Sequence, residues 1–522
     1  MQKYINLNAK VGMGEDYASA QEVMEQMDRL GVYTTVMEYT TGSNARYLNN
    51  KLLDMIGELP RDRVIPGYYL GMQTVFETGG METLRQMLKE RPGCIVLYPK
   101  DSQYQLKAIA MALDKLEDLP LVVLMDALQI RNNGGAEDLV YLAQRFPNMS
   151  FVIRRVMYTS MPLVVDAMYR AKNVYVENSW LHTRNANGML SKHFGSDRIL
   201  FSLGKKGNGG AAMAAVTFAD LSEEEKENIR WGNFARIFGE VTVKAMPNRV
   251  QNSFWTPFVE EGKVPDVPIY DIHTHMGPTG SNWYLENCDF ESQIAGFEAD
   301  METYHVRKIV SSCSGRPDLI EANREMEAAV GEKTDRFKGY LRYDPRYGEK
   351  YTRAYMDELM ARDYFVGLKT LPEYMDTDIR DAAYEPMFRY AHEHKLPILI
   401  HCWGDGLGAP HKCAEAAARW PDAKVILGHS GGNDVGKAQS ESFGKDPKYQ
   451  NVYFEFCGSF PASSSWKHTL EYVDHKRVLF GTDACLHDIS WEMGRLLSED
   501  IDDETLTAIL GGNAKELFGF ED

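Results

Sequence analysis

The sequence predicts an α/β protein made of two tandem (β/α)8 TIM-like barrels. Three observations predict this fold: a length of 522 residues, short apolar runs that alternate with amphipathic stretches, and the recurrence of these runs in the same order in both halves. A chain of this length exceeds a single core and fits two domains of about 250 residues each. We expect a first barrel at residues 1–245, a linker at 246–266 and a second barrel at 267–522.

Eight apolar runs in the second half are candidate strands. They are IYDIHTHMG, VRKIVSSCSG, FKGYLRYDP, VGLKTLP, LPILIHCWG, AKVILGHSGG, NVYFEFCGS and KRVLFGTDA. The intervening segments, such as YEPMFRYAHEHK, have the apolar spacing of amphipathic helices. Eight strand–helix repeats over about 250 residues are typical of a parallel barrel. Continuous apolar runs such as LPILI indicate strands that helices cover on the outside.

The first half repeats this order of runs. LPLVVLMDA stands where LPILIHCWG stands, FPNMSFVIRR matches WPDAKVILGH, KNVYVENSW matches QNVYFEFCG, and DRILFSLG matches HKRVLFGTD. Near the end of each copy, WGNFARIFG matches GGNAKELFG. These shared details favour an internal duplication over a likeness of fold alone. The join, MPNRVQNSFWTPFVEEGKVPD, has three prolines and no clear periodicity, which is typical of a linker.

The bulk composition limits the class of protein. A formal net charge of −18 argues against nucleic acid or an anionic membrane surface as a partner. The seven cysteines include no CxxC pair, which indicates reduced thiols. The N-terminal MQKYINLNAKVG lacks the pattern of a signal peptide, and no apolar run is long enough to span a bilayer. We therefore expect a cytoplasmic protein that binds neither nucleic acid nor a membrane. A small-molecule substrate and a homo-oligomeric state are separate expectations, which do not follow from composition.

Histidines are concentrated in the second half. Of 13 histidines, only His182 and His193 precede residue 273. In the first candidate strand of the second half, Asp271, His273 and His275 alternate, so all three side chains should face the barrel axis. Two imidazoles held side by side suit a borderline cation such as Zn²⁺.

Three further candidate ligands end other strands of this barrel. His401 ends the fifth strand, His429 the sixth and Asp483 the eighth. Because barrel active sites collect side chains from the carboxyl ends of several strands, we expect these residues to converge with those of the first strand. A cluster of four imidazoles and a carboxylate predicts a metal site rather than a structural feature.

The motifs DIHTHMG, HCWG, GHSGG and GTDA resemble those of the amidohydrolase superfamily, across the whole second half. They are most similar to the amidohydrolase-related branch that includes aminocarboxymuconate-semialdehyde decarboxylase. The resemblance implies His273, His275, His401 and Asp483 as ligands of one divalent metal, zinc first and manganese as an alternative. It also implies His429 as a catalytic or substrate-polarising residue, and a metal-bound water as the nucleophile in hydrolytic members.

The expected chemistry follows from these roles. A dication bound by neutral imidazoles lowers the pKa of its water towards neutrality. Asp483 would then take the proton and pass it to the leaving group, and His429 would hydrogen-bond or protonate the developing oxyanion. Asp271 either orients a ligand histidine or is a plain strand-end carboxylate.

Other residues at the same mouth are candidates for substrate binding. Arg342 could bind a substrate carboxylate bidentately. Lys369 could be carbamylated and bridge two metals, as in binuclear members of the superfamily, but we favour a substrate-anchoring cation or an ion-pair partner. Trp403, Arg316 and His487 lie in loops, where local structural roles compete with substrate binding, and we include Trp403 with Arg342 and Lys369 as substrate-binding candidates.

The first barrel lacks the metal ligands. In the alignment of the two copies, Asn8 stands at the position of His273 and Lys10 at that of His275. Leu124 stands at the position of His401, Arg155 at that of His429, and Gly204 at that of Asp483. We therefore expect this degenerate copy to bind no metal. It is a stabilising or dimerising domain, or it keeps an anion pocket built from cations at strand ends, which are Lys10, Lys100, Arg155, Lys205 and Lys206.

Three functions remain open from the sequence. Our first choice is a metal-dependent hydrolase that acts on a C–N or C–O bond of a small organic substrate through a metal-activated water. The alternative is a non-oxidative decarboxylase of a small unsaturated or aromatic carboxylic acid. His273 favours hydrolysis slightly, since the aromatic decarboxylases of this branch often have glutamate there. The third is a non-catalytic binding or scaffold protein.

Overall fold

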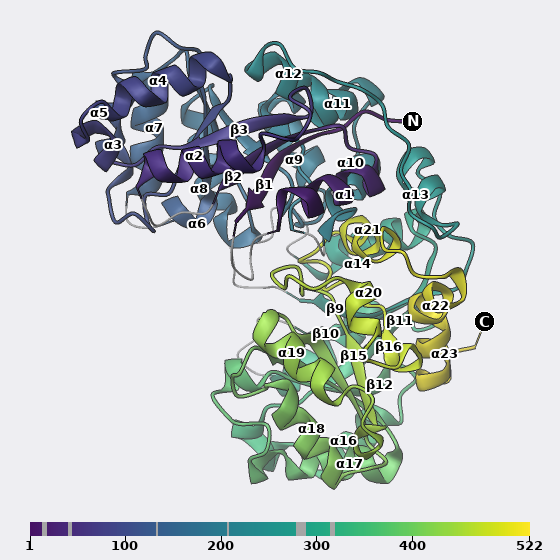
Figure 1. Cartoon of the computed structure of the whole chain (residues 1–522). Helices are drawn as coiled ribbons and strands as arrows, with labels where there is room; N and C mark the ends of the chain where they lie inside the picture. The colour runs from purple at the N-terminus through teal and green to yellow at the C-terminus, as the bar shows by residue number, and fades with distance from the viewer. Residues whose placement is uncertain are drawn as a thin grey trace. The chain divides into compact units, whose positions relative to one another are not determined.

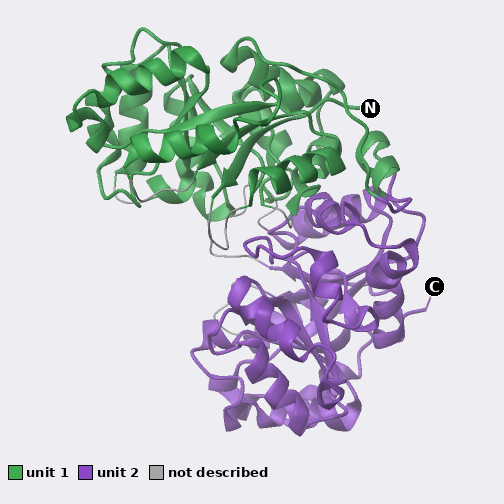
Figure 2. Cartoon of the chain, in the orientation of Figure 1, with its two compact units in different colours: residues 1–250, 255–262 green, residues 251–254, 263–522 purple. Residues whose placement is uncertain are grey.

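The chain forms two compact units (Figure 2). The computed structural model describes residues 1–12, 18–39, 44–131, 134–205, 208–277, 289–313 and 319–521. The first unit comprises Met1–Val250 and Trp255–Gly262, and the second comprises Gln251–Phe254 and Lys263–Asp522. The expected linker is therefore divided between the two units. Among the described residues, no helix is both long and apolar enough to cross a membrane.

Each unit contains an eight-stranded parallel sheet whose strands follow one another in chain order (Figure 1). The strands of the first sheet are β1 (Ile5–Val11), β2 (Thr34–Tyr39), β3 (Val64–Tyr69), β4 (Cys94–Leu97), β5 (Val122–Asp126), β6 (Ser150–Arg154), β7 (Val174–Glu177) and β8 (Ile199–Leu200). Those of the second are β9 (Ile269–Met276), β10 (Val306–Cys313), β11 (Phe337–Arg342), β12 (Phe365–Thr370), β13 (Pro397–Trp403), β14 (Lys424–Gly431), β15 (Val452–Glu455) and β16 (Val478–Leu479).

Both sheets close on themselves. The amide of Leu7 in β1 donates to the carbonyl of Phe201 after β8, at 3.3 Å. In the second unit the amide of Ile272 in β9 donates to the carbonyl of Phe480 after β16, at 3.1 Å. The predicted pair of tandem (β/α)8 barrels is confirmed.

Helices connect successive strands on the outside of each barrel (Figure 1). Those of the first unit are α1 (Ala20–Leu30), α2 (Ala45–Met55), α3 (Gln73–Phe76), α4 (Gly80–Glu90), α5 (Ala110–Leu113), α6 (Ala127–Ile130), α7 (Gly135–Arg145), α8 (Met161–Arg170), α9 (Ala186–Phe194), α10 (Ala211–Thr217), α11 (Glu223–Glu227), α12 (Asn233–Phe238) and α13 (Trp255–Glu261). Those of the second are α14 (Phe290–Thr303), α15 (Leu319–Val330), α16 (Arg353–Met360), α17 (Glu385–His394), α18 (Pro410–Arg419), α19 (Asp434–Phe443), α20 (Trp466–Leu470), α21 (Ile489–Leu497), α22 (Asp503–Thr507) and α23 (Asn513–Phe518).

Local sequence signals set these boundaries. Ser19 caps α1 through its hydroxyl, which accepts the amide of Glu22, while the Glu22 carboxylate accepts the amide of Ser19. The helix ends at Gly31, whose φ of 76° is left-handed. The continuous apolar run of β14 is buried along almost its whole length, as expected for a strand covered by helices.

The internal duplication extends to single hydrogen bonds. Asn233 donates its side-chain amide to two backbone carbonyl groups at or just before β8, and Asn513 makes the same two bonds at β16. Arg198 donates to the carbonyls of three residues before β8, and so does Arg477 before β16. Each copy also ends in an α-helix interrupted by one π turn, at η5 (Asn228–Gly232) and η11 (Ala508–Gly512).

Candidate metal centre

Strand β9 carries the first half of the candidate centre. His275 Nε2 lies 3.0 Å from Asp483 Oδ1, and His273 Nε2 lies 3.9 Å from the same oxygen. All three side chains are buried, and their donor atoms lie within 4.8 Å of one another. They are therefore close enough to contact a single ion.

The histidines of the fifth and sixth strands form a pair beside this group. The His401 ring lies 4.8 Å from the His429 ring, which in turn lies 4.9 Å from that of His273. His429 Nδ1 is 2.8 Å from the carbonyl oxygen of Cys457, so it must carry a proton and donate it. His401 Nδ1 lies 3.1 Å from His429 Nε2 and donates to it when both rings are neutral, which leaves the lone pair of His401 on Nε2.

The protonation states of these donors suit a metal. Burial lowers the pKa of His273, His275 and His401, so the rings are neutral. Burial opposes the ionisation of Asp483, but His275 and the neighbouring histidines hold the pKa of this carboxyl well below its ordinary value. Neutral imidazoles and an ionised carboxylate are the forms that bind a dication. The donor set therefore fits a borderline divalent ion.

Lys369 enters the same site from β12. Its side chain is fully buried, and its Nζ donates to His273 Nε2 at 2.7 Å. Burial lowers the pKa of Lys369 to about 7. Because the lysine uses the lone pair that an ion would need, Lys369 and a metal exclude one another at this nitrogen.

Comparison with known proteins identifies the family of this barrel. The amidohydrolase family model matches residues 270–520, from β9 to beyond α23. The second barrel belongs to the amidohydrolase family. The resemblance of its sequence motifs to this superfamily is thereby confirmed. Among curated proteins, none matches the chain.

Solved structures resemble about half of the chain. The 5-carboxyvanillate decarboxylase of Sphingomonas paucimobilis is 14% identical and covers 49% of this chain and 100% of its own, with a TM-score of 0.36. A probable 2-pyrone-4,6-dicarboxylic acid hydrolase of Acinetobacter baumannii, with citric acid bound, is 16% identical over 48% and 99% of the two chains (TM-score 0.36). A dihydroxybenzoic acid decarboxylase of Polaromonas sp. JS666, with bound manganese and the inhibitor 2-nitroresorcinol, is 16% identical over 48% and 97% (TM-score 0.36).

The carboxylate of Asp271 in the amidohydrolase barrel accepts hydrogen bonds from backbone amides and a hydroxyl and, among the described residues, not from a histidine ring. Its carboxylate accepts the amide of His273 at 3.2 Å, the amide of Thr482 at 3.1 Å and the Thr482 hydroxyl at 2.5 Å. It therefore fixes the residue that precedes Asp483. Gly481 is required in the same turn, since a Cβ there would come within 2.7 Å of the Cβ of His273.

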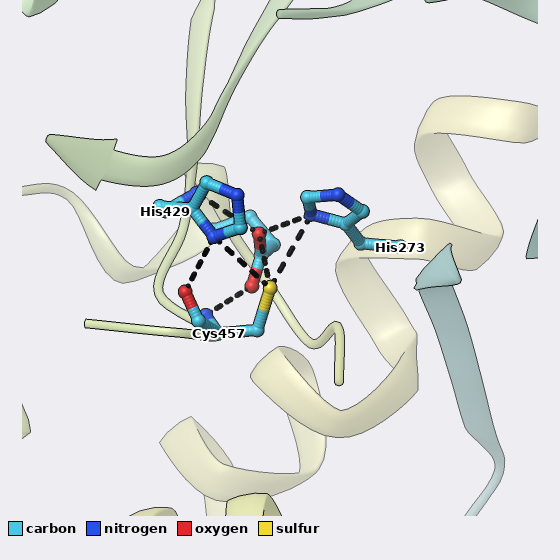
Figure 3. Close-up of side chains that lie close together, drawn as sticks. His273, His429 and Cys457 are labelled. Atoms are coloured by element: carbon cyan, nitrogen blue, oxygen red, sulfur yellow. Dashed lines mark hydrogen bonds and ion pairs between the residues drawn. The ribbon is translucent and has the colours of Figure 1, made fainter. Parts of the chain in front are cut away.

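The residue that holds the His273 ring is Glu455, which the sequence analysis missed. Figure 3 shows the side chains of His273, His429 and Cys457 directed towards one another. Glu455 ends β15, and its Oε2 lies 2.8 Å from His273 Nδ1. The available signal was one carboxylate at the end of an apolar strand, in the run NVYFEFCGS.

His487 has the local partners that the sequence analysis favoured for it. It is buried, with its Nε2 4.0 Å from Asp483 Oδ2 and its Nδ1 3.1 Å from Glu492 Oε1. Arg495 pairs with the other oxygen of Glu492 at 2.6 Å. This loop histidine is thus held beside Asp483 by Glu492.

Two of the substrate-binding candidates, Trp403 and Arg342, lie near these residues. The Trp403 ring is nearly parallel to that of His401, at 6.4 Å and 7°. Arg342 is buried and donates to the carbonyl of Cys313 at 2.6 Å, while its Nε has no hydrogen-bond partner within the described chain. Tyr374, 65% exposed, lies edge-on to His401 at 5.3 Å. Arg316 lies outside the described residues.

The structure corrects one aligned position in the first barrel. In the first barrel, strand pairing places Asp126 beside Arg154, and the next residue, Arg155, has a positive φ. In the second barrel it places His401 beside Gly428, and the next residue, His429, also has a positive φ. Asp126 therefore occupies the position of His401, and Leu124 does not. The alignment on Leu-Pro was wrong here because Pro397 begins β13, whereas β5 begins two residues after Pro120.

A buried ion network fills the corresponding place in the first barrel. Lys10 Nζ lies 2.8 Å from Asp126 Oδ2, and Arg154 lies 3.0 Å from Asp126 and 3.1 Å from Glu38. Arg155 approaches Asp126 at 3.6 Å. Lys10 and Arg155, two cations of the expected anion pocket, are therefore neutralised internally. Lys100, another cation of that set, lines a separate hollow of about 470 Å³, and Lys206 lies outside the described residues.

Proposed function

We propose that the protein is a metal-dependent hydrolase that acts on a C–N or C–O bond of a small organic substrate at the mouth of the amidohydrolase barrel. The observation that carries this proposal is the buried group of His273, His275 and Asp483, whose donor atoms lie within 4.8 Å of one another. The His429 ring lies 4.9 Å from that of His273, and the His401 ring lies 4.8 Å from that of His429. We expect the cytoplasmic, homo-oligomeric state that the sequence analysis predicts.

The residues that would hold the ion are His273, His275, His401 and Asp483. A divalent cation bound there, zinc first and manganese as the alternative, polarises a substrate oxygen and acidifies water. Asp483 is the proton carrier in this proposal, since its ionised carboxylate can accept a proton from water and return it to the leaving group. His487, 4.0 Å from its second oxygen, is placed to share that proton.

His429 acts as an acceptor in this arrangement. Its Nδ1 proton is used by the Cys457 carbonyl, so the neutral ring presents a lone pair at Nε2. Burial lowers its pKa to about 4, which keeps the ring neutral. In the structure this lone pair accepts from His401 Nδ1 at 3.1 Å. We therefore propose that His429 takes a proton from the substrate or water when this bond to His401 opens, and that it polarises an oxyanion only after it has been protonated.

The substrate carries a carboxylate in this proposal. Arg342 is a buried guanidinium that, among the described residues, donates to the neutral carbonyl of Cys313, and Lys369 is a second buried cationic side chain nearby. A buried cation needs a compensating anion. Trp403 and Tyr374 flank His401 and present rings against which a planar substrate can pack.

Decarboxylation is the second candidate. The same two cations favour it, since every substrate of such a reaction is a carboxylic acid. The experiment is to incubate the metal-loaded protein with lactones, amides and unsaturated or aromatic acids, and to measure ring opening or amide cleavage together with CO₂ release. Cleavage without CO₂ supports hydrolysis, and CO₂ release supports the second candidate. Activity that persists in Asp483→Asn would contradict both.

Arg342→Met tests the substrate assignment. Loss of a charge-assisted bond of about 1.5–3 kcal/mol should raise KM about 10- to 150-fold for substrates with a carboxylate. Neutral analogues should be affected little. An equal effect on both kinds of substrate would show that Arg342 has only a structural role.

A further inference from the structure

The carboxylate of Glu455 lies directly behind the His273 ring. Both side chains are fully buried, and the ring nitrogen concerned, Nδ1, faces away from Asp483. A carboxylate accepts hydrogen bonds and donates none when ionised. The 2.8 Å contact therefore places the single proton of neutral His273 on Nδ1 and leaves the lone pair on Nε2, where the ion would bind.

The surrounding bonds leave Glu455 little freedom. Its Oε2 also accepts the amide of His429 at 3.2 Å and the thiol of Cys457 at 3.1 Å, and its Oε1 accepts the amide of Cys457. Glu455, Cys457, His429 and His273 could also be considered as a separate metal site, since their donor atoms lie within 4.8 Å of one another. Because each of these atoms already has a hydrogen-bond partner, we interpret them as an orienting network instead (Figure 3).

The first barrel contains the same carboxylate without the histidine. Glu177 ends β7 as Glu455 ends β15, and its oxygens accept the amides of Arg155 at 2.9 Å and Ser179 at 2.8 Å. Glu455 bonds the two corresponding amides in its own barrel. The backbone role is therefore common to both copies, and the bond to an imidazole belongs to the second copy only.

We propose that Glu455 is a positioning residue of the metal centre, which fixes the His273 ring through Nδ1 so that Nε2 faces the ion. The inference rests on the metal-dependent function proposed above. Carboxylates that orient ligand histidines change metal affinity about 10- to 100-fold when they are removed.

The test compares Glu455→Gln with Glu177→Gln in the full-length chain. A glutamine replaces one of the two acceptor oxygens by an NH₂ group, which donates and does not accept, so at either position it disturbs the two backbone amide bonds alike. Only at position 455 does it also disturb an imidazole. Binding of Zn²⁺ and of Mn²⁺ is measured by competition with a chromophoric chelator. We expect affinity to fall about 10- to 100-fold in Glu455→Gln and to remain at the wild-type value in Glu177→Gln.

A second measurement reports the tautomer itself. In metal-free protein with ¹⁵N-labelled histidine, the His273 signal, assigned by its loss in His273→Gln, should show Nδ1–H in the wild type. It should gain Nε2–H character in Glu455→Gln and stay unchanged in Glu177→Gln. If Glu455→Gln does not fold, Glu455→Asp keeps the charge but shortens the reach to His273, and it should show the same two changes.

The outcomes separate the two proposals. Equal metal affinity in the two glutamine variants, or an Nε2–H tautomer in the wild type, overturns the role of Glu455 while the metal centre stands. A wild-type protein that binds neither ion overturns the proposed function itself.

Discussion

Lys369 is the residue on which the number of metals depends. Its amine lies 2.7 Å from His273 Nε2, so as an unmodified lysine it competes with an ion for that lone pair. As a carbamate it would instead supply oxygen ligands and bridge two ions. The two possibilities predict opposite results when the side chain is removed.

We predict that Lys369→Met keeps one bound metal per chain and binds it at least as tightly as the wild type. The reason is that the substitution removes a competitor for Nε2 and a buried positive charge. Elemental analysis and chelator competition measure both quantities, with His275→Gln as the variant that should lose the ion. A fall from two metals to one, or to none, would identify Lys369 as a ligand.

Some residues of the site could be predicted from the sequence and others could not. The alternation of His273 and His275, and the position of Asp483 at a strand end, could be predicted because they depend on local periodicity. The role of Glu455 could not, since its contact with His273 is set by closure of the barrel. The contact between His273 and Glu455 joins residues 182 positions apart, which no local pattern reports.

At the level of strands, the apolar runs predicted both barrels because strand formation here depends on continuous burial. The register within a strand depends on where pairing begins, and this is why Asp126 was missed. Asp126 is now the centre of an ion network in the first barrel, with Lys10 and Arg154 at 2.8 and 3.0 Å. We interpret this network as the structural replacement for a metal.

Asp126→Asn should therefore destabilise the first barrel. Removing one partner of a buried ion network leaves uncompensated charge and costs about 3–5 kcal/mol. Asp166→Asn is the control, since Asp166 pairs with Arg170 at an exposed site, where a pair contributes about 0–1 kcal/mol. Chemical denaturation measures both. A cost below about 1 kcal/mol for Asp126→Asn would show that the network does not stabilise this barrel.

The same carboxylate predicts a dependence on pH. Burial alone would raise the pKa of Asp126, but Lys10, Arg154 and Arg155 hold it well below the ordinary value of 3.8. Its stabilisation is then fully present above about pH 4 and is lost as the pH falls further. The difference in unfolding free energy between wild type and Asp126→Asn should be constant from pH 5 to 7 and shrink below about pH 4. A difference that grows in acid would contradict this assignment.

At the scale of the whole molecule, the two barrels share a fold but differ at the carboxyl ends of their strands. There the first barrel has a network of ion pairs around Asp126, and the second has the candidate metal centre. A bound ion stabilises the unit that holds it by about 4 kcal/mol when its free concentration is a thousand times Kd. We predict that a chelator lowers the unfolding temperature of the second barrel and leaves that of the first unchanged. Calorimetry, with Asp126→Asn to mark the transition of the first barrel, measures this. If the chelator instead lowered the unfolding temperature of the first barrel, the ion would lie in that barrel and the prediction would be wrong.

The most direct test of the account is the metal content of the purified full-length protein, measured beside that of His273→Gln and Asp483→Asn. The account predicts one divalent ion per chain in the wild type and none in either variant, with the first barrel intact in all three. A wild-type chain without a tightly bound ion, or variants that retain it, would contradict the assignment of these residues as a metal centre.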